Sequence, residues 1–407
     1  MMGDKRTILF VDDEPNILAG LKRMLRPMRS EMRFFFAENS TLAQQCLTEQ
    51  AIDIVVADMR MPGMDGASLL SFIQKQYPQI TRIMLTGHAD DEAVLRTVGV
   101  AHRFLTKPID PETLKETLRR SATLQDMLAN SGLKSLVAGL GSLPPLPETY
   151  ARLEKQLRQP DCALNDIAQI IEQDPAMSAK ILQLVNSAFF GLYTHVESPA
   201  RAVNLLGLDT IKALVLGLGI FSEMPVQASR FFSVTELWRH SMTCATFART
   251  IAARESEDKI ILEQSFIGGL LHDVGKLLLF ANRRQEYEQA IAHARENKRS
   301  IQEEERDLFG SCHGDVGAYL IGLWGLPDPV VEALFFHHRL EEYPEPGLSP
   351  ALVIHVADAL YHQLDQDQAA MPVHLAMPVL EQAGLAGHLE TWAGLCAEIL
   401  ARGEEND

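Results

Sequence analysis

The sequence has few of the features that mark secreted or membrane-embedded proteins. Its five cysteines are scattered, and no two of them form a CxxC pair. This distribution argues against a disulfide framework and against a cysteine-based zinc site. The longest apolar run, from Ala213 to Phe221, is about half as long as a bilayer-spanning helix. Acidic residues follow the N-terminus too closely for a signal peptide. We therefore expect a soluble cytoplasmic protein that does not contact membranes.

Positive charge is also scarce. The chain has 37 lysines and arginines against 54 aspartates and glutamates, so its formal net charge is −17 at pH 7. A surface of this sign repels nucleic-acid phosphates. No basic recognition helix is apparent in the sequence, and we expect no nucleic-acid partner.

The 407 residues are enough for two or three domains, and a hydrophobic content of 46% is ordinary for a globular protein. The first 120 residues or so alternate short apolar runs with helix-period segments. The five runs are Ile8–Val11, Phe34–Ala37, Ile52–Ala57, Arg82–Leu85 and Arg103–Leu105. Strands that alternate with helices predict a doubly wound α/β domain with a parallel sheet.

Strand signals nearly vanish in the rest of the chain. Residues 129–142 read as a linker, and Gly and Pro are clustered from Gly139 to Pro147. From Glu148 to Leu400 the sequence predicts a succession of helices. Several of them open at a capping residue or a proline: Asp161, Asp174-Pro175, Ser198-Pro199 and Ser349-Pro350. The second part is therefore predicted to be all-helical.

Polar residues stand at the carboxyl ends of the predicted strands, where open α/β sheets bind their ligands. Asp12-Asp13 ends the first strand, Asp58 the third and Thr86-Gly87 the fourth, and Lys107-Pro108 follows the fifth. Converging carboxylates repel one another and favour a hard divalent cation such as Mg²⁺. A carboxylate beside that cation can act as a nucleophile towards a phosphoryl group.

The motifs FVDDEP, VVADMRMPGMDG, MLTGHAD and RFLTKPI make residues 5–128 resemble the receiver domains of two-component response regulators. The resemblance implies a flavodoxin-like (βα)5 fold and makes Asp58 the phospho-acceptor. It assigns Mg²⁺ to Asp13 and Asp58, with Asp12 assisting through water and the Arg60 carbonyl completing the site.

The same resemblance gives roles to residues on the last two strands. Thr86 and Lys107 would contact the phosphoryl group, and Phe104 takes the place of the switch aromatic. Pro108 would supply the cis peptide bond that the family has after its lysine. The implied phosphate donor is a sensor histidine kinase, and receivers often pair when phosphorylated, so a homodimer is a candidate assembly.

The helical part resembles the HDOD family. The motifs that carry this resemblance include LPPLPETYARL, IIEQDPAMSAKILQLVNSAFFG, AVNLLGLDTIKALVLGLG, LWRHS, GLLHDVGK and FFHH. We assign residues 143–364 to this output domain, with an HD-like subregion at about 234–364. Residues 365–407 would form a C-terminal helical extension.

Ionisable residues in the HD-like subregion form a candidate metal centre. They are Glu236, His240, His272, Asp273, His313, His337, His338 and Asp358. Glu236 and His240 are four residues apart, so they share one helix face. Burying so many ionisable groups costs free energy unless they are paired or bind metal. Imidazole with carboxylate suits Fe, Mn or Zn, and a dinuclear site could activate water for phosphoester hydrolysis.

The order of these residues is similar to that of the HD phosphohydrolases, including the HD-GYP phosphodiesterases of cyclic di-GMP. Lys276 matches the lysine that follows the His-Asp pair, so Lys276 and Asp273 become candidate catalytic residues. After His337-His338, however, the sequence RLEEYPEPGLSP has no GYP motif. Other histidines, His362 among them, are read as structural or surface residues.

Two hypotheses for the output follow. In the first, phosphorylation of Asp58 switches an output domain that acts mainly through contacts with a downstream protein. In the second, the receiver regulates a metal-dependent phosphohydrolase or cyclic-dinucleotide phosphodiesterase. A third and weaker alternative is a receptor that binds a cyclic dinucleotide without cleaving it.

Overall fold

A computed structural model describes most of the chain. The described residues are 5–77, 79–86, 101, 103–127, 132–133, 136–137, 146–157, 162–187, 196–223, 229–344, 347–364 and 374–404. They form two compact units, the first mainly within Met1–Leu146 and the second mainly within Pro147–Asp407. In the part of the chain that the structure describes, no helix is both long enough and apolar enough to cross a membrane.

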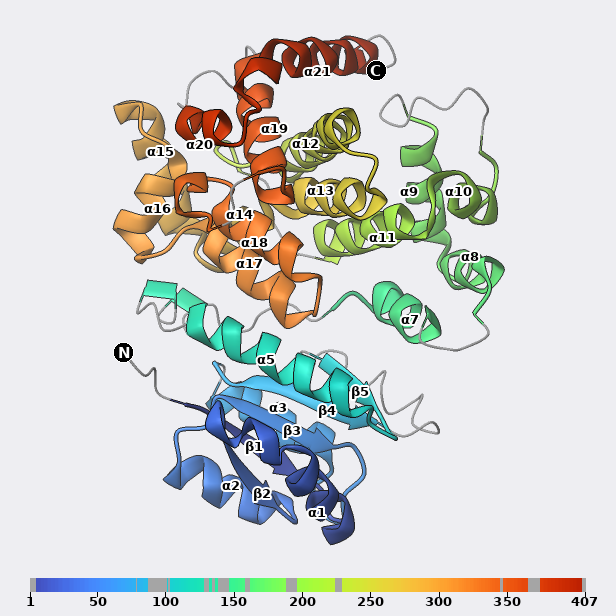
Figure 1. Cartoon of the computed structure of the whole chain (residues 1–407), viewed down its shortest axis with the longest axis vertical. Coiled ribbons are helices and arrows are strands. Elements are labelled where there is room, and N and C mark those ends of the chain that lie inside the picture. The colour runs from blue at the N-terminus through green and yellow to red at the C-terminus, as the bar shows by residue number, and fades with distance from the viewer. Residues whose placement is uncertain are drawn as a thin grey trace. The chain divides into compact units, whose positions relative to one another are not determined.

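The first unit, the sheet unit, alternates strands and helices as the sequence predicts (Figure 1). Its strands are β1 (Arg6–Val11), β2 (Met32–Ala37), β3 (Ile54–Asp58), β4 (Thr81–Thr86) and β5 (Arg103–Thr106). Its helices are α1 (Pro15–Met24), η1 (Arg26–Ser30), α2 (Ser40–Glu49), α3 (Gly66–Gln76) and α5 (Pro111–Met127). Each predicted strand is found within two residues of its expected bounds.

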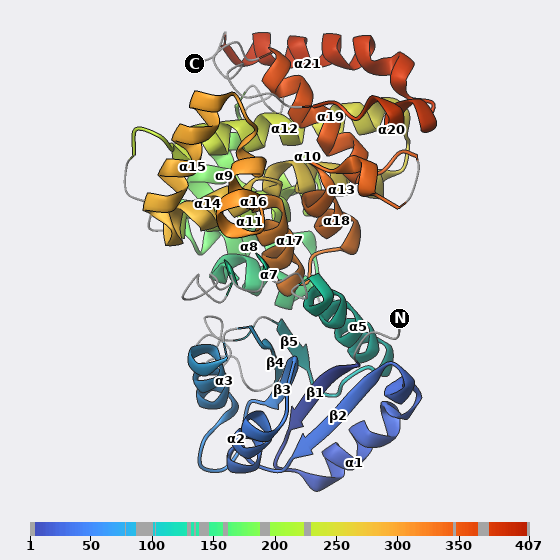
Figure 2. The same cartoon turned by 90° about the vertical axis from the view of Figure 1, so that its left-hand side faces the viewer.

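The five strands form one parallel sheet in the order β2-β1-β3-β4-β5. Alternate residues of each strand face opposite sides, which gives two cores. Val55 and Ala57 pack on one side with α2 and α3, whereas Ile54 and Val56 pack on the other with α1 and α5. Figure 2 shows the helices on the two faces of the sheet. The predicted doubly wound α/β fold is confirmed.

The second unit, the helical unit, is all-helical, which confirms the other half of the predicted fold class. Its first helices are α7 (Glu148–Leu157), α8 (Leu164–Glu172), α9 (Pro175–Val185), α10 (Pro199–Leu206), α11 (Leu208–Glu223), α12 (Val234–Glu255), α13 (Lys259–Leu271) and α14 (Val274–Asn282). They are followed by α15 (Arg284–Asn297), α16 (Ile301–Phe309), α17 (His313–Leu323), α18 (Asp328–Phe336), η2 (Leu340–Glu342), α19 (Pro350–Leu364), α20 (Met377–Gln382), η3 (Ala386–His388) and α21 (Leu389–Glu404).

The predicted helix starts are marked by side-chain caps. The Asp174 carboxylate accepts a hydrogen bond from the Met177 backbone at the start of α9. The Ser198 hydroxyl does the same at the start of α10, and the Ser349 hydroxyl caps α19. A side-chain oxygen at this position accepts a hydrogen bond from a backbone N–H that has no partner within the helix. Asp161 and most of the predicted linker lie outside the described residues.

The C-terminal helix α21 belongs to the core of the helical unit. Trp392 and Cys396 are fully buried in the cluster that contains Phe247 of α12 and Val353 of α19. The indole nitrogen of Trp392 also donates to the Glu255 carboxylate at 3.0 Å. The segment predicted as an extension therefore contributes buried side chains to the same core as the preceding helices.

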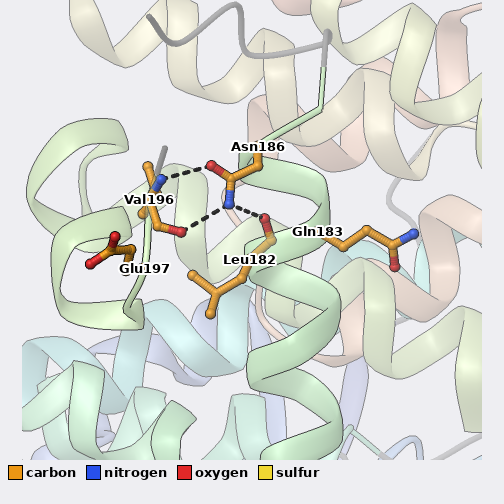
Figure 3. A pocket seen from close by; sticks show the side chains of 5 residues that line it. All are labelled: Leu182, Gln183, Asn186, Val196 and Glu197. Atoms are coloured by element: carbon orange, nitrogen blue, oxygen red, sulfur yellow. Dashed lines mark hydrogen bonds between the residues drawn. The ribbon is translucent and has the colours of Figure 1, made fainter. Parts of the chain in front are cut away.

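A shallow pocket beside α9 is lined in part by Asn186, Val196 and Glu197 (Figure 3). The Asn186 amide accepts from the Val196 N–H at 2.7 Å and donates to the Val196 carbonyl at 2.9 Å. It also donates to the Leu182 carbonyl at 2.8 Å. This side chain therefore joins the end of α9 to the segment before α10, and these hydrogen bonds satisfy the half-buried amide.

Candidate phosphorylation site and metal centre

Three acidic side chains meet where β1 and β3 end. Asp12 follows β1 and Asp58 is the last residue of β3, with exposed fractions of 1% and 7%. Together with the half-buried Asp13, each offers a carboxylate oxygen within 4.8 Å of the others. The two strands are parallel neighbours, so their carboxyl ends lie at one edge. An oxygen-only donor set of this kind fits Mg²⁺.

Lys107 is the cation that faces these carboxylates. Its Nζ lies 2.7 Å from Asp12 Oδ2 and 2.6 Å from Asp58 Oδ1. Burial works against the ammonium charge, but hydrogen bonds and attraction to both carboxylates outweigh it and raise the pKa of Lys107. Burial also raises the pKa of Asp58, and Lys107 only partly offsets this. Additional positive charge beside Asp58 would therefore stabilise its ionised form.

The other predicted receiver residues surround this edge. Thr86 ends β4, is buried, and points its hydroxyl towards the Leu105 carbonyl at 3.5 Å. The Arg60 backbone N–H bonds to the Asp58 carboxylate and partly offsets the rise in its pKa, while the metal-binding role of the Arg60 carbonyl stays a prediction. The Lys107-Pro108 peptide bond is cis, as predicted. Phe104 lies on β5, and its side chain is outside the described residues.

The motif that follows Asp58 contains Gly66, a position at which only glycine fits. A Cβ atom on Gly66 would lie 2.0 Å from the Asp58 carbonyl oxygen, which no side chain can occupy. The Gly66 N–H donates to the Met59 carbonyl at 3.0 Å. The glycine therefore lets the start of α3 approach the end of β3, which holds the Asp58 backbone in place.

Seven of the eight residues predicted as an output metal centre converge in the helical unit. His240 comes from α12, His272 and Asp273 from the junction of α13 and α14, His313 from the first position of α17, His337 and His338 from the end of α18, and Asp358 from α19. Six of them are buried, and the seventh, His338, is half-buried. They divide into two donor groups.

The first donor group contains His240, His272 and Asp358. His240 Nε2 lies 3.0 Å from His272 Nε2, 3.4 Å from Asp358 Oδ1 and 3.2 Å from Asp273 Oδ2. Donor atoms around one tetrahedral metal ion are about 3.3 Å apart when each metal–ligand bond is about 2.05 Å. The spacing of these four atoms therefore matches a single metal ion. The Cys244 sulfur also belongs to this group.

The second donor group contains His313, His337 and His338. His313 Nε2 lies 3.1 Å from His338 Nε2 and 3.2 Å from Asp273 Oδ1. His337 Nε2 lies 4.0 Å from the same carboxylate oxygen. Asp273 thus presents Oδ2 to the first group and Oδ1 to the second. A carboxylate placed in this way can bridge two metal ions.

The imidazole rings are oriented so that their Nε2 atoms face the cluster. His272 Nδ1 lies 2.7 Å from the Gly269 carbonyl, and His337 Nδ1 lies 2.7 Å from the Leu334 carbonyl. A carbonyl can only accept, so each Nδ1 carries the proton, and the Nε2 of the neutral ring is left with a lone pair.

Several of these inward-facing atoms have no hydrogen-bond partner. Asp273 Oδ1, His337 Nε2 and Asp358 Oδ1 are buried and unsatisfied. Burying unpaired acceptors is costly, and bringing their lone pairs together adds repulsion. A metal ion would remove both costs. The donor set, imidazole with carboxylate, suits Fe, Mn or Zn.

Electrostatics keeps His337 and Asp273 in metal-binding forms. Burial lowers the pKa of His337 well below its usual range, and the neighbouring His272 and His313 reinforce the effect. Burial opposes the charge of Asp273, but His272 and Lys276 outweigh it and hold the pKa of Asp273 well below its usual range. Lys276 Nζ lies 2.7 Å from Asp273 Oδ2. His337 is therefore held neutral and Asp273 ionised, whereas attraction to Glu305 outweighs burial and raises the pKa of His313 to about 9.

Glu236 is the member of the predicted set that the structure does not bring into the cluster. It lies in the first turn of α12, where its backbone N–H is capped by the Ser233 hydroxyl, and its side chain is exposed. It belongs to neither donor group. Glu236 and His240 do share a helix face, but Glu236 is one turn closer to the helix end, beyond the buried part of that face.

Three residues near the cluster were not predicted. His362 Nε2 lies 3.4 Å from Asp358 Oδ1, one helical turn away. Cys244 is one turn from His240, and Glu305 contacts His313 from α16 at 2.6 Å. The four-residue spacing could have indicated the first two, whereas nothing in the sequence pairs Glu305 with His313. His355 is a core histidine, bonded to the His337 carbonyl and the Ala376 N–H.

Two family profiles match the chain. Residues 8–119 match the response regulator receiver domain, and residues 143–340 match the HDOD domain. The chain therefore consists of a receiver domain joined to an HDOD domain. This combination supports a response regulator.

Individual relatives match parts of the chain. An uncharacterised protein of Treponema pallidum is 27% identical over 65% of this chain and 49% of its own length. The DNA-binding transcriptional regulator NtrC of Proteus hauseri is 32% identical over 36% of this chain and 32% of its own length. The chain thus spans about half or less of these curated relatives.

Solved structures extend the likeness to the output domain. An HDOD domain protein of unknown function from Geobacter sulfurreducens is 25% identical, with a TM-score of 0.54, over 68% of this chain and 93% of that one. A candidate phosphohydrolase from Shewanella amazonensis is 23% identical, with a TM-score of 0.51, over 67% of this chain and 98% of that one. The second likeness shows the fold alone.

Proposed function

We propose that a sensor histidine kinase phosphorylates Asp58 and that the phosphoryl group switches the HDOD output domain. The observation that supports this most directly is the geometry around Asp58. Its buried carboxylate lies beside those of Asp12 and Asp13 and 2.6 Å from Lys107 Nζ. Mg²⁺ held by the three carboxylates would neutralise the charge of an incoming phosphoryl group.

The residues of the chain would then rearrange around the new group. Phosphorylation adds about −1.5 to −2 charge at neutral pH. Lys107, which now contacts the carboxylates directly, would move its ammonium to a phosphoryl oxygen. The Thr86 hydroxyl would turn from the Leu105 carbonyl towards the same group. Phe104 is the predicted aromatic that follows this movement, which would alter the face formed by β5 and α5.

Incubation of the protein with acetyl phosphate and Mg²⁺ tests this proposal. We expect an acid-stable, base-labile acyl phosphate on Asp58, found by mass spectrometry. A phosphorylated wild type whose signalling in cells is indistinguishable from that of Asp58→Ala would contradict the switch. A wild type that never acquires the acyl phosphate would contradict the acceptor role itself.

For the output domain, we propose a buried metal centre in a domain that acts mainly through contacts with a downstream protein. The supporting observation is that six of the seven donor residues are buried. Metal sites whose ligands are all protein groups and which are closed to solvent usually stabilise a fold, whereas catalytic sites keep an open position. Metal analysis of the purified protein tests the centre, and two bound ions per chain are expected.

The position of Asp273 favours a second candidate function, metal-dependent phosphoester hydrolysis. Its two carboxylate oxygens face the two donor groups, an arrangement that could hold two ions and a water between them. Turnover of nucleotides and cyclic dinucleotides by the wild type, lost in His272→Ala/Asp273→Ala, would favour the enzyme. A metal-loaded wild type without turnover would favour the interaction role.

A further inference from the structure

Glu305 is a buried carboxylate that no sequence motif singled out. It lies on α16, is 0% exposed, and accepts three hydrogen bonds. Tyr287 Oη donates to Glu305 Oε1 at 2.8 Å. The backbone N–H of His313 and its ring Nδ1 both lie close to Glu305 Oε2, at 2.8 and 2.6 Å. One side chain thus fixes both the backbone and the ring of His313.

We propose that Glu305 is the positioning residue of the second metal position, the one formed by His313, His337, His338 and Asp273 Oδ1. This inference rests on the proposed metal centre. A carboxylate next to Nδ1 selects the tautomer whose proton sits on that nitrogen. The Nε2 lone pair of His313 is then directed at the space between Asp273 and His338, where the metal would bind.

The other two anchored histidines differ from His313 in the charge of their partner. His272 and His337 donate Nδ1–H to the neutral carbonyls of Gly269 and Leu334. A carboxylate attracts that proton more strongly than a carbonyl does, so it leaves more electron density on Nε2 and makes the imidazole a better ligand. Glu305 therefore strengthens the second position and makes the two positions unequal.

Glu305 could instead serve only the fold. Its bond to the His313 N–H caps the start of α17, and its bond from Tyr287 connects α15 to α16. A purely structural role would lower the stability of the metal-free protein and weaken both metal positions together. A positioning role weakens one position and leaves the metal-free fold intact. The two roles are therefore separable by experiment.

The variant Glu305→Gln distinguishes the positioning role from the structural role because it removes the charge of the side chain and keeps its shape. Its amide oxygen can still accept from His313, and its amide N–H can donate to Tyr287 Oη. The matched control is Tyr287→Phe, which removes a hydrogen bond to Glu305 and keeps the carboxylate beside His313. Both full-length variants are stripped of metal and titrated with Co²⁺, followed by calorimetry and by the visible absorption of the bound ion.

We expect the wild type to bind two equivalents of Co²⁺. In Glu305→Gln, one equivalent should bind roughly 10- to 100-fold more weakly while the other keeps its affinity. Tyr287→Phe should bind both as the wild type does, and the metal-free melting temperature of Glu305→Gln should equal that of the wild type.

Three results would overturn the inference. In the first, Glu305→Gln binds both equivalents with wild-type affinity, which leaves the metal centre standing and removes the role of Glu305. In the second, both equivalents weaken equally and the metal-free protein melts earlier, which assigns Glu305 to the fold. In the third, the wild type binds no Co²⁺, and the metal centre itself fails.

Discussion

The receiver site and the output cluster both place a lysine beside buried carboxylates, but they differ in the donor atoms that they offer to a metal ion. In the receiver, Lys107 contacts Asp12 and Asp58 directly, and all the predicted metal donors are oxygen atoms. In the output cluster, five histidines and two aspartates supply mixed nitrogen and oxygen donors. Hard oxygen ligands favour Mg²⁺, which exchanges readily, whereas imidazole favours transition metals.

This difference also suits the two sites to different tasks. Asp13 and Lys107 are only half-buried, so a phosphate donor has a route to Asp58. His272, His313 and His337 have exposed fractions of at most 1%, so the output cluster is closed around its donors. The comparison therefore separates a partly exposed site from one that holds its ligands in a packed core.

The largest expected effect is at the receiver. Asp58→Asn should abolish phosphorylation by acetyl phosphate and Mg²⁺, because the amide is not a nucleophile for phosphoryl transfer. Phosphate-affinity electrophoresis measures the modified fraction. Glu49→Gln, at an exposed position on α2, is the matched control and should be phosphorylated normally. Phosphorylation of Asp58→Asn at the wild-type level would show that the acceptor is another residue. The contrast between the receiver site and the output cluster would then fail.

The next effect concerns the carboxylate between the two donor groups. Asp273→Asn should lower the metal content from two ions per chain to none, because one carboxylate faces both groups. Asp358→Asn should lower the metal content by one ion per chain, because Asp358 belongs to the first donor group. Glu236→Gln is the control and should keep both. Atomic spectroscopy on purified proteins measures the content, and loss of metal in Glu236→Gln would contradict the structure around α12.

The core that encloses the output cluster predicts a large but finite effect on stability. Trp392→Ala should lower the free energy of unfolding by about 3–5 kcal/mol, because a fully buried indole leaves a cavity. Trp392→Phe should cost less, since it keeps most of the packing. Urea unfolding followed by circular dichroism measures both. An unchanged midpoint in Trp392→Ala would show that α21 does not support the helical core.

The smallest expected effect tests whether Lys107 stabilises the metal-free receiver site. Lys107→Met should destabilise the metal-free protein at pH 7 by roughly 1–3 kcal/mol, because it leaves carboxylates without their cation. Mg²⁺ should restore part of that loss, since it can replace the ammonium charge. Differential scanning calorimetry with and without Mg²⁺ measures this. Lys75→Met, exposed on α3, should change little. Equal destabilisation with and without Mg²⁺ would argue against a metal site at Asp58.

The sequence placed the candidate receiver residues close together because strands impose a simple geometry. Asp12, Asp58 and Thr86 each follow or end a short apolar run, and parallel strands bring their carboxyl ends to one edge. Local pattern and position in the sheet are therefore sufficient to place these side chains together. The cis bond before Pro108 was implied by the resemblance to receiver domains and is confirmed.

The output cluster was predicted in composition but not in arrangement. Periodicity places His240 on a buried helix face and cannot say which other helix meets it. The sequence alone determined two domains of different class and a set of candidate ligands. Only the tertiary structure decided that Asp273 stands between two donor groups, that Glu236 lies outside them and that Glu305 anchors His313. The reason is that packing between helices distant in the chain fixes these contacts, and helical periodicity carries no information about that packing.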